Sequence, residues 1–346
     1  MNITEKLTNW YSIHKRNLPW RNTTNPYFIW LSEIILQQTQ VAQGLSYYKA
    51  FTTTFPTVYD LAKAQESEVL KLWQGLGYYS RARNLHASAK YMVAELDGQF
   101  PNTYNEIIKL KGVGDYTASA IASICFNEQT AVVDGNVYRG LSRIFGIFTP
   151  INTGKGFKEF KALSQKLIDK KQPAMYNQAI MEFGAIQCKP KNPDCSVCPF
   201  NINCVAFNKN LVSELPVKLK PLKVKQKFFN FIVILSTDQK TIFEKREGKG
   251  IWQHLFQFPL IETKKPAKVE DIVKELKEFL ILKNKNFKVT LYNNEAIIHK
   301  LSHQHLYTKF WIVTLETKLL QGVPIGKIRD FPVPKLIDNF IERFNF

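Results

Sequence analysis

Four of the five cysteines in this chain lie within one short stretch, AIQCKPKNPDCSVCPFNINCV (185–205). They are Cys188, Cys195, Cys198 and Cys204, with six, two and five residues between successive members. Zinc sites usually combine two close cysteine pairs separated by a longer arm, whereas this stretch holds a single C-x-x-C. Four closely spaced thiolates suit a [4Fe–4S] cluster, because its irons favour sulfur ligands. A structural zinc remains the alternative.

Two carboxylates lie in sequence surroundings that would alter their chemistry. Glu33 in WLSEIILQQTQV is flanked by apolar residues, and burial among them would raise its pKa toward neutrality. Such a group is a candidate general acid, unless it lies with Gln37 and Gln40 on a solvated helix face. Asp134 in AVVDGNVYRGLSRIFG is suited to cap the helix that follows, or to hold a negative charge near a cation. The residues alone leave both pairs of roles open.

A helix, a tight glycine turn and a second helix are predicted over LKGVGDYTASAIA (110–122). Gly112 and Gly114 let the backbone turn sharply and approach a partner closely. The free N–H groups that begin the second helix would bind a phosphate without reading base sequence. The chain carries 47 Lys and Arg against 29 Asp and Glu, a formal charge of +18. A lysine-rich surface alone could account for this excess, but it favours double-stranded nucleic acid as the partner.

The elements that must position these residues fall into two halves of different character. Helical periodicity dominates residues 1–208. Residues 228–346 show strand-like patterns and one amphipathic helix over 269–280. The stretch 209–227 between them carries two prolines and many lysines, as is typical of a linker. We therefore expect a multidomain fold, with an all-α domain followed by an α+β domain. Within the second domain, KFFNFIVILSTDQKTIFEKR is expected to form a hairpin.

The chain shows no sign of membrane insertion or export. No apolar run approaches the roughly 20 residues that span a bilayer, and the first residues lack the apolar core of a signal peptide. We therefore expect a cytoplasmic protein without a targeting signal. Thiols stay reduced in that compartment, so a metal is expected at the cysteine stretch rather than disulfides. The fifth cysteine, Cys125, is expected to be a buried apolar residue.

Motifs across the chain resemble those of the helix-hairpin-helix DNA glycosylase superfamily, and more closely its MutY-type adenine DNA glycosylases. Residues 18–204 contain, in order, LPWR, WLSEIILQQTQV, WQGLGYYSRARNL, LKGVGDYTASAI, VVDGNVYRGLSRI, NQAIMEFGAIQC and the cysteine spacing. LSHQH (301–305) extends the resemblance into the second half. It implies a helical glycosylase domain, built as a six-helix barrel with a [4Fe–4S] cluster domain, followed by a MutT/Nudix-like domain.

The resemblance also implies a reaction in base-excision DNA repair. Adenine opposite 8-oxoguanine or guanine would be flipped out of the duplex, because its glycosidic bond is unreachable inside the stack. Glu33 would donate a proton to N7 of the adenine, and Asp134 would stabilise or capture the cationic sugar. The product would be an abasic site. The same resemblance assigns supporting roles around the sugar to Tyr116 and Asn136, around the adenine to Arg21 and Gln178, and as cluster ligands to Cys188, Cys195, Cys198 and Cys204.

Tyr116 stands where bifunctional relatives of the endonuclease III type carry a lysine nucleophile. The resemblance therefore implies a monofunctional glycosylase without efficient strand cleavage. The second domain lacks the Nudix catalytic box and is expected to read the lesion. The family usually has an aromatic residue where this chain has Leu301. The residues expected at the lesion and the DNA are Gln38, Thr39, Leu76, Tyr78, Gly112, Gly114, Ser302 and His303.

The expected partner is double-stranded DNA with adenine opposite 8-oxoguanine or guanine, bound by a monomer. Two other interpretations remain. One is a different glycosylase of the superfamily, such as one that acts on thymine mismatches or a lyase. The other is a non-catalytic iron–sulfur protein that binds DNA or senses redox state.

Overall fold

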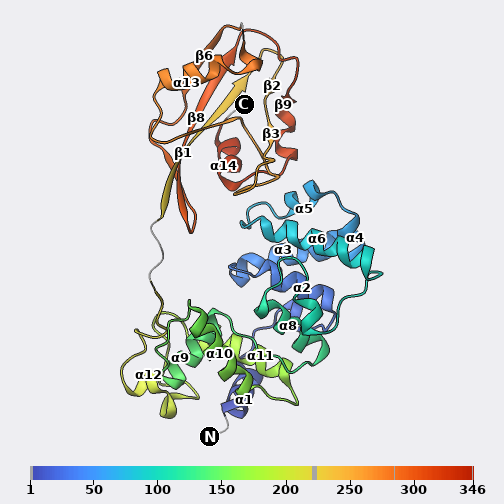
Figure 1. The fold of residues 1–346 in the computed structure, drawn as a ribbon, viewed down its shortest axis with the longest axis vertical. Coiled ribbons are helices and arrows are strands. Elements are labelled where there is room, and N and C mark those ends of the chain that lie inside the picture. Colours follow the sequence, from blue (N-terminus) through green and yellow to red (C-terminus); the bar gives the residue numbers. More distant parts are fainter. Residues whose placement is uncertain (1–2, 220–223, 284, 345) are drawn as a thin grey trace. The chain divides into compact units, whose positions relative to one another are not determined.

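The computed structural model describes residues 3–219, 224–283, 285–344 and 346, and Figure 1 shows its elements. The chain forms two compact units. The first joins Met1–Lys63 to Asn84–Lys220, and the second joins Ala64–Arg83 to Pro221–Phe346. The domain limits expected from the sequence, 1–208 and 228–346, stay a prediction. Residues 220–223 of the expected linker lie outside the described residues.

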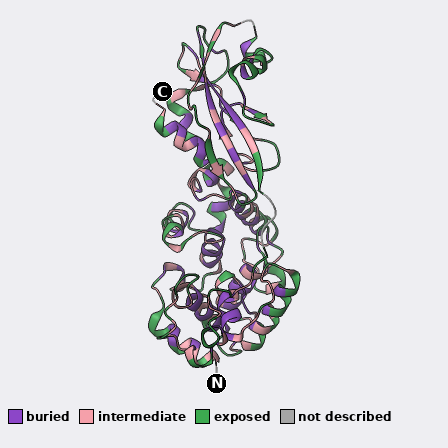
Figure 2. Ribbon diagram, turned by 90° about the vertical axis from the view of Figure 1, so that its left-hand side faces the viewer, coloured by how far each residue is buried: buried purple, intermediate pink, exposed green. Residues whose placement is uncertain are grey.

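The first unit is helical, and its buried residues, purple in Figure 2, lie inside the unit. Its elements are α1 (Ile3–His14), η1 (Pro19–Arg21), α2 (Pro26–Ile35), α3 (Val41–Thr54), α4 (Val58–Lys63), most of α6 (Ser80–Glu95), α7 (Tyr104–Ile107), α8 (Asp115–Phe126), α9 (Gly135–Phe145), α10 (Gly154–Leu167), α11 (Pro173–Glu182), η2 (Phe183–Gln187), η3 (Asn201–Asn203) and α12 (Val205–Asn208).

Helix α2 lies at the centre of this unit and is buried along almost its whole length. Pro26 begins it, and the Asn25 side chain caps it by accepting a hydrogen bond from the backbone N–H of Tyr27. Helix α8 packs against α2, and its buried segment, Thr117–Ser123, consists mainly of alanine and serine. Because these side chains are small, the two helices can approach closely. This packing places Glu33 of α2 next to the residues of α8.

Helices α9 and α11 carry the rest of the site. Asp134 caps the start of α9, and Gly146, with φ 68°, ends it in the left-handed conformation that favours glycine. Helix α11 continues directly into the π-helix η2, which ends immediately before Cys188. A π-helical turn widens the backbone locally and is frequent at functional sites. The cysteine stretch therefore begins at the end of a continuous helical segment.

The second unit contains a mixed sheet with the strand order β5-β1-β8-β6, and β7 also pairs with β8. Its central strands β1 and β8 are parallel, and the other pairs are antiparallel. The elements are α5 (Glu66–Leu72), β1 (Lys225–Leu235), β2 (Lys240–Thr241), β3 (Glu244–Lys245), β4 (Phe256–Gln257), β5 (Leu260–Thr263), α13 (Val269–Lys277), η4 (Leu280–Leu282), β6 (Phe287–Leu291), β7 (Ile297–Lys300), β8 (Gln304–Leu315), β9 (Val323–Pro324), η5 (Ile325–Asp330) and α14 (Lys335–Arg343).

Two expectations for this unit were wrong. The predicted hairpin over 227–246 does not form as a strand pair, because β1 pairs with β5 and β8 while β2 pairs with β9. Helix α13 ends at Lys277, so Leu280 lies in the separate turn η4, where it is 84% exposed. Alternation and helical spacing describe local conformation, but they do not specify which distant strand completes a sheet.

The segment Ala64–Arg83 belongs to the second unit although it lies in the helical half of the sequence. The Gln74 side-chain amide donates to Asp338 Oδ1 at 2.9 Å, and the Tyr79 hydroxyl donates to the Val333 carbonyl at 3.1 Å. The Lys71 ammonium donates to the Arg329 carbonyl at 2.6 Å. Among the residues that the structure describes, we find no helix of the length and apolarity that a membrane span requires.

Candidate active site and cysteine loop

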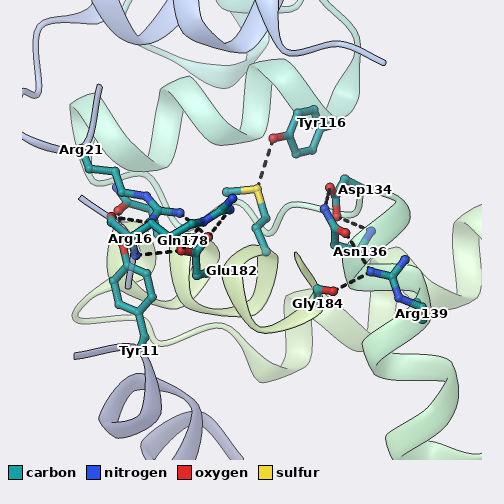
Figure 3. A network of polar contacts seen from close by, with 11 residues as sticks. Tyr11, Arg16, Arg21, Tyr116, Asp134, Asn136, Arg139, Gln178, Glu182 and Gly184 are labelled. Atoms are coloured by element: carbon teal, nitrogen blue, oxygen red, sulfur yellow. Dashed lines mark hydrogen bonds and ion pairs between the residues drawn. The ribbon is translucent and has the colours of Figure 1, made fainter. Parts of the chain in front are cut away.

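A cavity of about 530 Å³ in the first unit collects the catalytic candidates. Glu33 comes from α2, Tyr116 from α8, Asp134 and Asn136 from the start of α9, and Gln178 from α11; Arg21 of η1 completes the set. Six residues singled out in the sequence therefore meet at one cavity although they are distant along the chain. Figure 3 shows all of them except Glu33.

Glu33 is buried, with 8% of its surface exposed. The pKa of its carboxyl is raised to about 7, chiefly because the group is buried. The charge of Asp134 also raises this pKa, whereas a hydrogen bond with Tyr116 and the charge of Arg21 lower it. A carboxyl with this pKa is protonated in a large fraction of molecules at neutral pH. The surroundings of Glu33 therefore suit a general acid and are not those of a solvated helix face.

Asp134 caps α9 and also lines the cavity. Its Oδ1 atom accepts hydrogen bonds from the backbone N–H groups of Asn136 at 2.9 Å and Val137 at 2.8 Å, and its Oδ2 atom accepts from the Asn136 side chain at 2.8 Å. Burial raises the pKa of Asp134, while the hydrogen bonds from Val137 and Asn136 lower it.

The two expected partners of Asp134 differ in what they contact. Asn136 donates to Asp134 directly, whereas the Tyr116 hydroxyl lies 3.1 Å from the sulfur of Met181 and hydrogen-bonds Glu33. Burial, followed by the charges of Glu33 and Asp134, raises the pKa of Tyr116 well above its usual value. Tyr116 therefore stays protonated and can donate a hydrogen bond toward Glu33.

Arg21 and Gln178 belong to a group of polar residues on one side of the cavity, and only these two were expected from the sequence. Arg21 donates two hydrogen bonds to Glu182, at 2.9 and 2.7 Å, and Gln178 accepts one from the Tyr11 hydroxyl at 2.7 Å. Arg16 also binds Glu182 (Figure 3). Neither Glu182 nor Arg16 was a candidate from the sequence. The signal for Glu182 was available, because it is an acid among apolar residues in NQAIMEFGAIQC, as Glu33 is in its own motif.

Arg139 of α9 is a further residue that the sequence did not single out. Its guanidinium donates to the Asn136 side-chain oxygen at 2.9 Å, the Gly184 carbonyl at 2.6 Å and the Cys188 carbonyl at 2.7 Å. Gly184 lies so close to Asn136 that an added Cβ atom would stand 2.6 Å from its backbone oxygen. The start of α9 is thus held against the segment that leads to the first cysteine.

The four cysteines of the stretch 185–205 are free thiols that line one small pocket. Arg143 donates to the Cys188 sulfur at 3.4 Å, and the Cys204 thiol donates to the Arg143 carbonyl at 3.3 Å. Within the described residues, no three His, Cys, Asp or Glu side chains surround the position of a single metal ion. Each thiolate of a [4Fe–4S] cluster binds a different iron, so its ligands surround the cluster without meeting at one point. Four sulfurs around one pocket fit that group better than a single zinc.

The residues expected at the DNA are distributed over both units. Gly112, with φ 79°, and Gly114 are exposed in the turn before α8, and Gln38, with φ 55°, and Thr39 follow α2. In the second unit, Tyr78 is 50% exposed, whereas Leu76 is buried at 6%. Ser302 and His303 are exposed in the turn between β7 and β8. Exposure suits DNA contact for all of them except Thr39, which is half-buried and lines the cavity, and Leu76, which is buried.

Comparisons with known proteins agree with this arrangement. The family model of the HhH-GPD superfamily of base excision DNA repair proteins matches residues 31–177, and that of the NUDIX domain matches residues 230–343. The fold of the first unit resembles a solved thermostable thymine-DNA glycosylase at a TM-score of 0.56 and 28% identity, over 60% of this chain and 95% of that chain. A trapped endonuclease III–DNA covalent intermediate has the same fold at a TM-score of 0.53 and 22% identity, over 60% of this chain and 95% of that chain.

Similar sequences carry one name. The adenine DNA glycosylase of Buchnera aphidicola subsp. Schizaphis graminum is 34% identical over 99% of this chain and 98% of its own length. The adenine DNA glycosylase of Homo sapiens is 44% identical over 58% of this chain and 38% of its own length. A match over almost both whole chains includes the helical unit with its cavity and the C-terminal sheet. The chain therefore belongs to the adenine DNA glycosylases, within the HhH-GPD superfamily of base excision DNA repair proteins.

Proposed function

We propose that this protein hydrolyses the N-glycosidic bond of adenine paired with 8-oxoguanine or guanine and leaves an abasic site. The observation that carries the proposal is the pair of carboxyl groups in one cavity. Burial raises the pKa of Glu33 to about 7, and Asp134 is held in place by two backbone N–H groups and the Asn136 side chain. One proton donor and one anion are what glycoside hydrolysis requires.

We propose a reaction that uses both carboxyl groups. Adenine flips into the cavity, and protonated Glu33 donates its proton to N7, so that the base leaves without a full negative charge. The bonding electrons of the glycosidic bond go to the base, and the sugar becomes cationic. Asp134 stabilises that cation electrostatically or bonds to it, and water then adds to the sugar carbon. Asn136 holds Asp134, and Tyr116 holds Glu33. The adenine is contacted by Arg21 and Gln178.

The absence of a lysine at position 116 supports a monofunctional enzyme. Strand cleavage through a Schiff base needs an amine nucleophile, and Tyr116 supplies a hydroxyl that burial keeps protonated. A purified protein that nicks abasic DNA through a borohydride-trapped intermediate would contradict this part of the proposal.

The second unit is proposed to read the base opposite the adenine. Ser302 and His303 are exposed between β7 and β8, where they can contact 8-oxoguanine. Tyr78 of the second unit, and Gln38 and Thr39 of the first, are proposed to fill and flank the gap that the flipped base leaves. Leu76 is not included, because it is only 6% exposed. Gly112 and Gly114 are proposed to bind backbone phosphates at the start of α8.

A [4Fe–4S] cluster held by Cys188, Cys195, Cys198 and Cys204 is proposed to stiffen the loop between them. When bound, the cluster would supply structural order to the loop rather than a step of hydrolysis. Two arginines hold the first cysteine of this loop: Arg139 donates to the Cys188 carbonyl, and Arg143 donates to the Cys188 sulfur. We also propose that the protein acts on DNA as a monomer. A location in the cytoplasm is proposed as well, which the bacterial origin of several relatives supports.

The first test is base release from a short duplex with one adenine opposite 8-oxoguanine, under single-turnover conditions with hot alkali to reveal abasic sites. Wild type should give alkali-dependent cleavage, and Glu33→Gln should give none while still binding the duplex. A duplex with thymine opposite guanine is the control for the second candidate, which the 28% identity to a thymine-DNA glycosylase favours. Release of thymine instead of adenine, or tight binding without any release, would contradict the proposal.

A further inference from the structure

Glu182 is a buried carboxylate in the wall of the cavity, and the reaction proposed above does not use it. Its side chain is 1% exposed. The backbone N–H and Nε of Arg16 donate to Oε1, both at 2.9 Å, and Nη2 of Arg16 donates to Oε2 at 2.6 Å. Two nitrogens of Arg21 donate to the same two oxygens at 2.9 and 2.7 Å (Figure 3). Two guanidinium groups thus enclose one carboxylate.

This cluster of three residues carries a net positive charge inside the cavity. Burial by itself raises the pKa of Glu182. The hydrogen bonds from Arg16 and Arg21 outweigh burial and bring the pKa down to about 2. Glu182 is therefore ionised at every pH at which the protein works. A buried ion pair often adds little to stability, because its desolvation cost offsets the attraction. Stability alone is thus a weak reason for placing three charges here.

Arg21 connects this cluster to the proposed acid. Its side chain is 14% exposed, and its charge lowers the pKa of Glu33, against the effect of burial. How strongly it does so depends on how much of its charge Glu182 neutralises. An Arg21 without its carboxylate partner would favour the ionised form of Glu33, and an ionised Glu33 has no proton to donate.

We propose that Glu182 is a positioning residue that holds Arg16 and Arg21 against the cavity wall and neutralises part of their charge, so that Glu33 keeps its proton. This inference rests on the proposed role of Glu33 as the acid. Glu182 need not touch the adenine for this role; it acts through the two arginines.

Several other charged or titratable groups interact with Glu33 or line the same cavity. They are Tyr116 and Cys125 of α8, Asp134 before α9, Arg139 of α9 and Arg21 of η1. Replacing Glu182 with glutamine keeps all of these groups and changes only the charge that balances the arginines. The pH dependence of the reaction therefore isolates the effect of Glu182.

The test is the pH profile of single-turnover adenine release for wild type and Glu182→Gln. In the variant, the decline of the rate at alkaline pH should move to lower pH by about one unit. The conservative variant Glu182→Asp should lie between the two. The double variant Glu182→Gln/Arg16→Gln removes one anion and one cation, so its decline should return toward that of wild type. A purely structural role predicts the opposite, namely more damage in the double variant.

An alkaline decline that stays at the wild-type pH, with a lower rate at every pH, would overturn the proposal. A melting temperature for each variant identifies any that fails to fold. In that event Arg21→Gln decides the question, because removal of this charge should move the decline to higher pH, and no movement would overturn the proposal. Glu33→Gln, measured in the same assay, separates the two proposals: release of adenine by this variant would refute the proposed function itself.

Discussion

At the residue scale, Glu33 and Asp134 are the same functional group in two different surroundings. Glu33 lies in α2, is buried against α8, and has one hydrogen-bond partner there, the Tyr116 hydroxyl. Asp134 receives three hydrogen bonds at the start of α9. Apolar enclosure favours a protonated acid, and hydrogen-bond donors favour an anion. This difference allows the two carboxyl groups to divide an acid role from a charge-stabilising role.

Burial of Glu33 has a consequence for stability that varies with pH. Its pKa rises from 4.5 in an exposed setting to about 7 in the fold. Between these values the folded chain holds a proton that the unfolded chain has released, so the free energy of unfolding falls as pH rises through this window. Glu33→Gln should therefore stabilise the protein at pH 8 relative to pH 5, by up to about 3 kcal/mol. Urea denaturation at the two pH values measures this, and an equal effect at both would contradict it.

At the element scale, α9 depends on Asp134 for its cap, and capping can be separated from catalysis. Asp134→Ala removes the acceptor for two backbone N–H groups and should cost about 1 kcal/mol, or roughly 2–4 °C in melting temperature. Asp134→Asn keeps a capping oxygen and should melt close to wild type. Both should lose adenine release, because neither carries the charge. Activity in Asp134→Asn would show that the carboxylate is only a cap.

The glycine turn before α8 allows a similar separation. Gly112→Ala should destabilise the fold by more than about 1 kcal/mol, because its φ is 79° and an added Cβ would lie 2.8 Å from Asn84. Gly114 has φ −104° and open space around it, so Gly114→Ala should fold normally yet bind duplex DNA several-fold more weakly. Gly154→Ala, at the open start of α10, is the matched control and should bind normally. Equal binding by both variants would remove the turn from the DNA-binding surface.

The sequence predicted local features better than long-range ones. Local sequence was enough to single out Glu33, Asp134 and the cysteines, because the informative neighbours lie within a few positions. Glu182 has the same local signal, an acid among apolar residues, but its partners Arg16 and Arg21 lie 166 and 161 residues away and could not be inferred from it. The pairing of the sheet was mispredicted for the same reason: β1 is an apolar run that is recognisable as a strand, but its parallel partner β8 follows about 80 residues later. Separation along the chain, rather than residue type, set what could be predicted.

At the scale of the whole molecule, the charge of +18 predicts binding that depends strongly on salt. Each phosphate contact releases bound counterions, so affinity for duplex DNA should fall by at least about tenfold between 50 and 200 mM salt. Fluorescence anisotropy with a labelled duplex measures this for adenine opposite 8-oxoguanine and for an undamaged control. An affinity that does not change with salt would mean that the basic residues lie away from the DNA.

The membership of Ala64–Arg83 in the second unit has a consequence for how the chain can be divided. Gln74 and Tyr79 hydrogen-bond Asp338 and Val333, so one cut between residues 220 and 221 would leave each fragment with part of the same unit. We expect fragments 1–220 and 221–346, produced together, to associate and copurify without a covalent link. Gln74→Ala/Tyr79→Phe in the first fragment should weaken that association. Split halves of this enzyme would then behave as a reconstituting pair, which two independently folded modules would not.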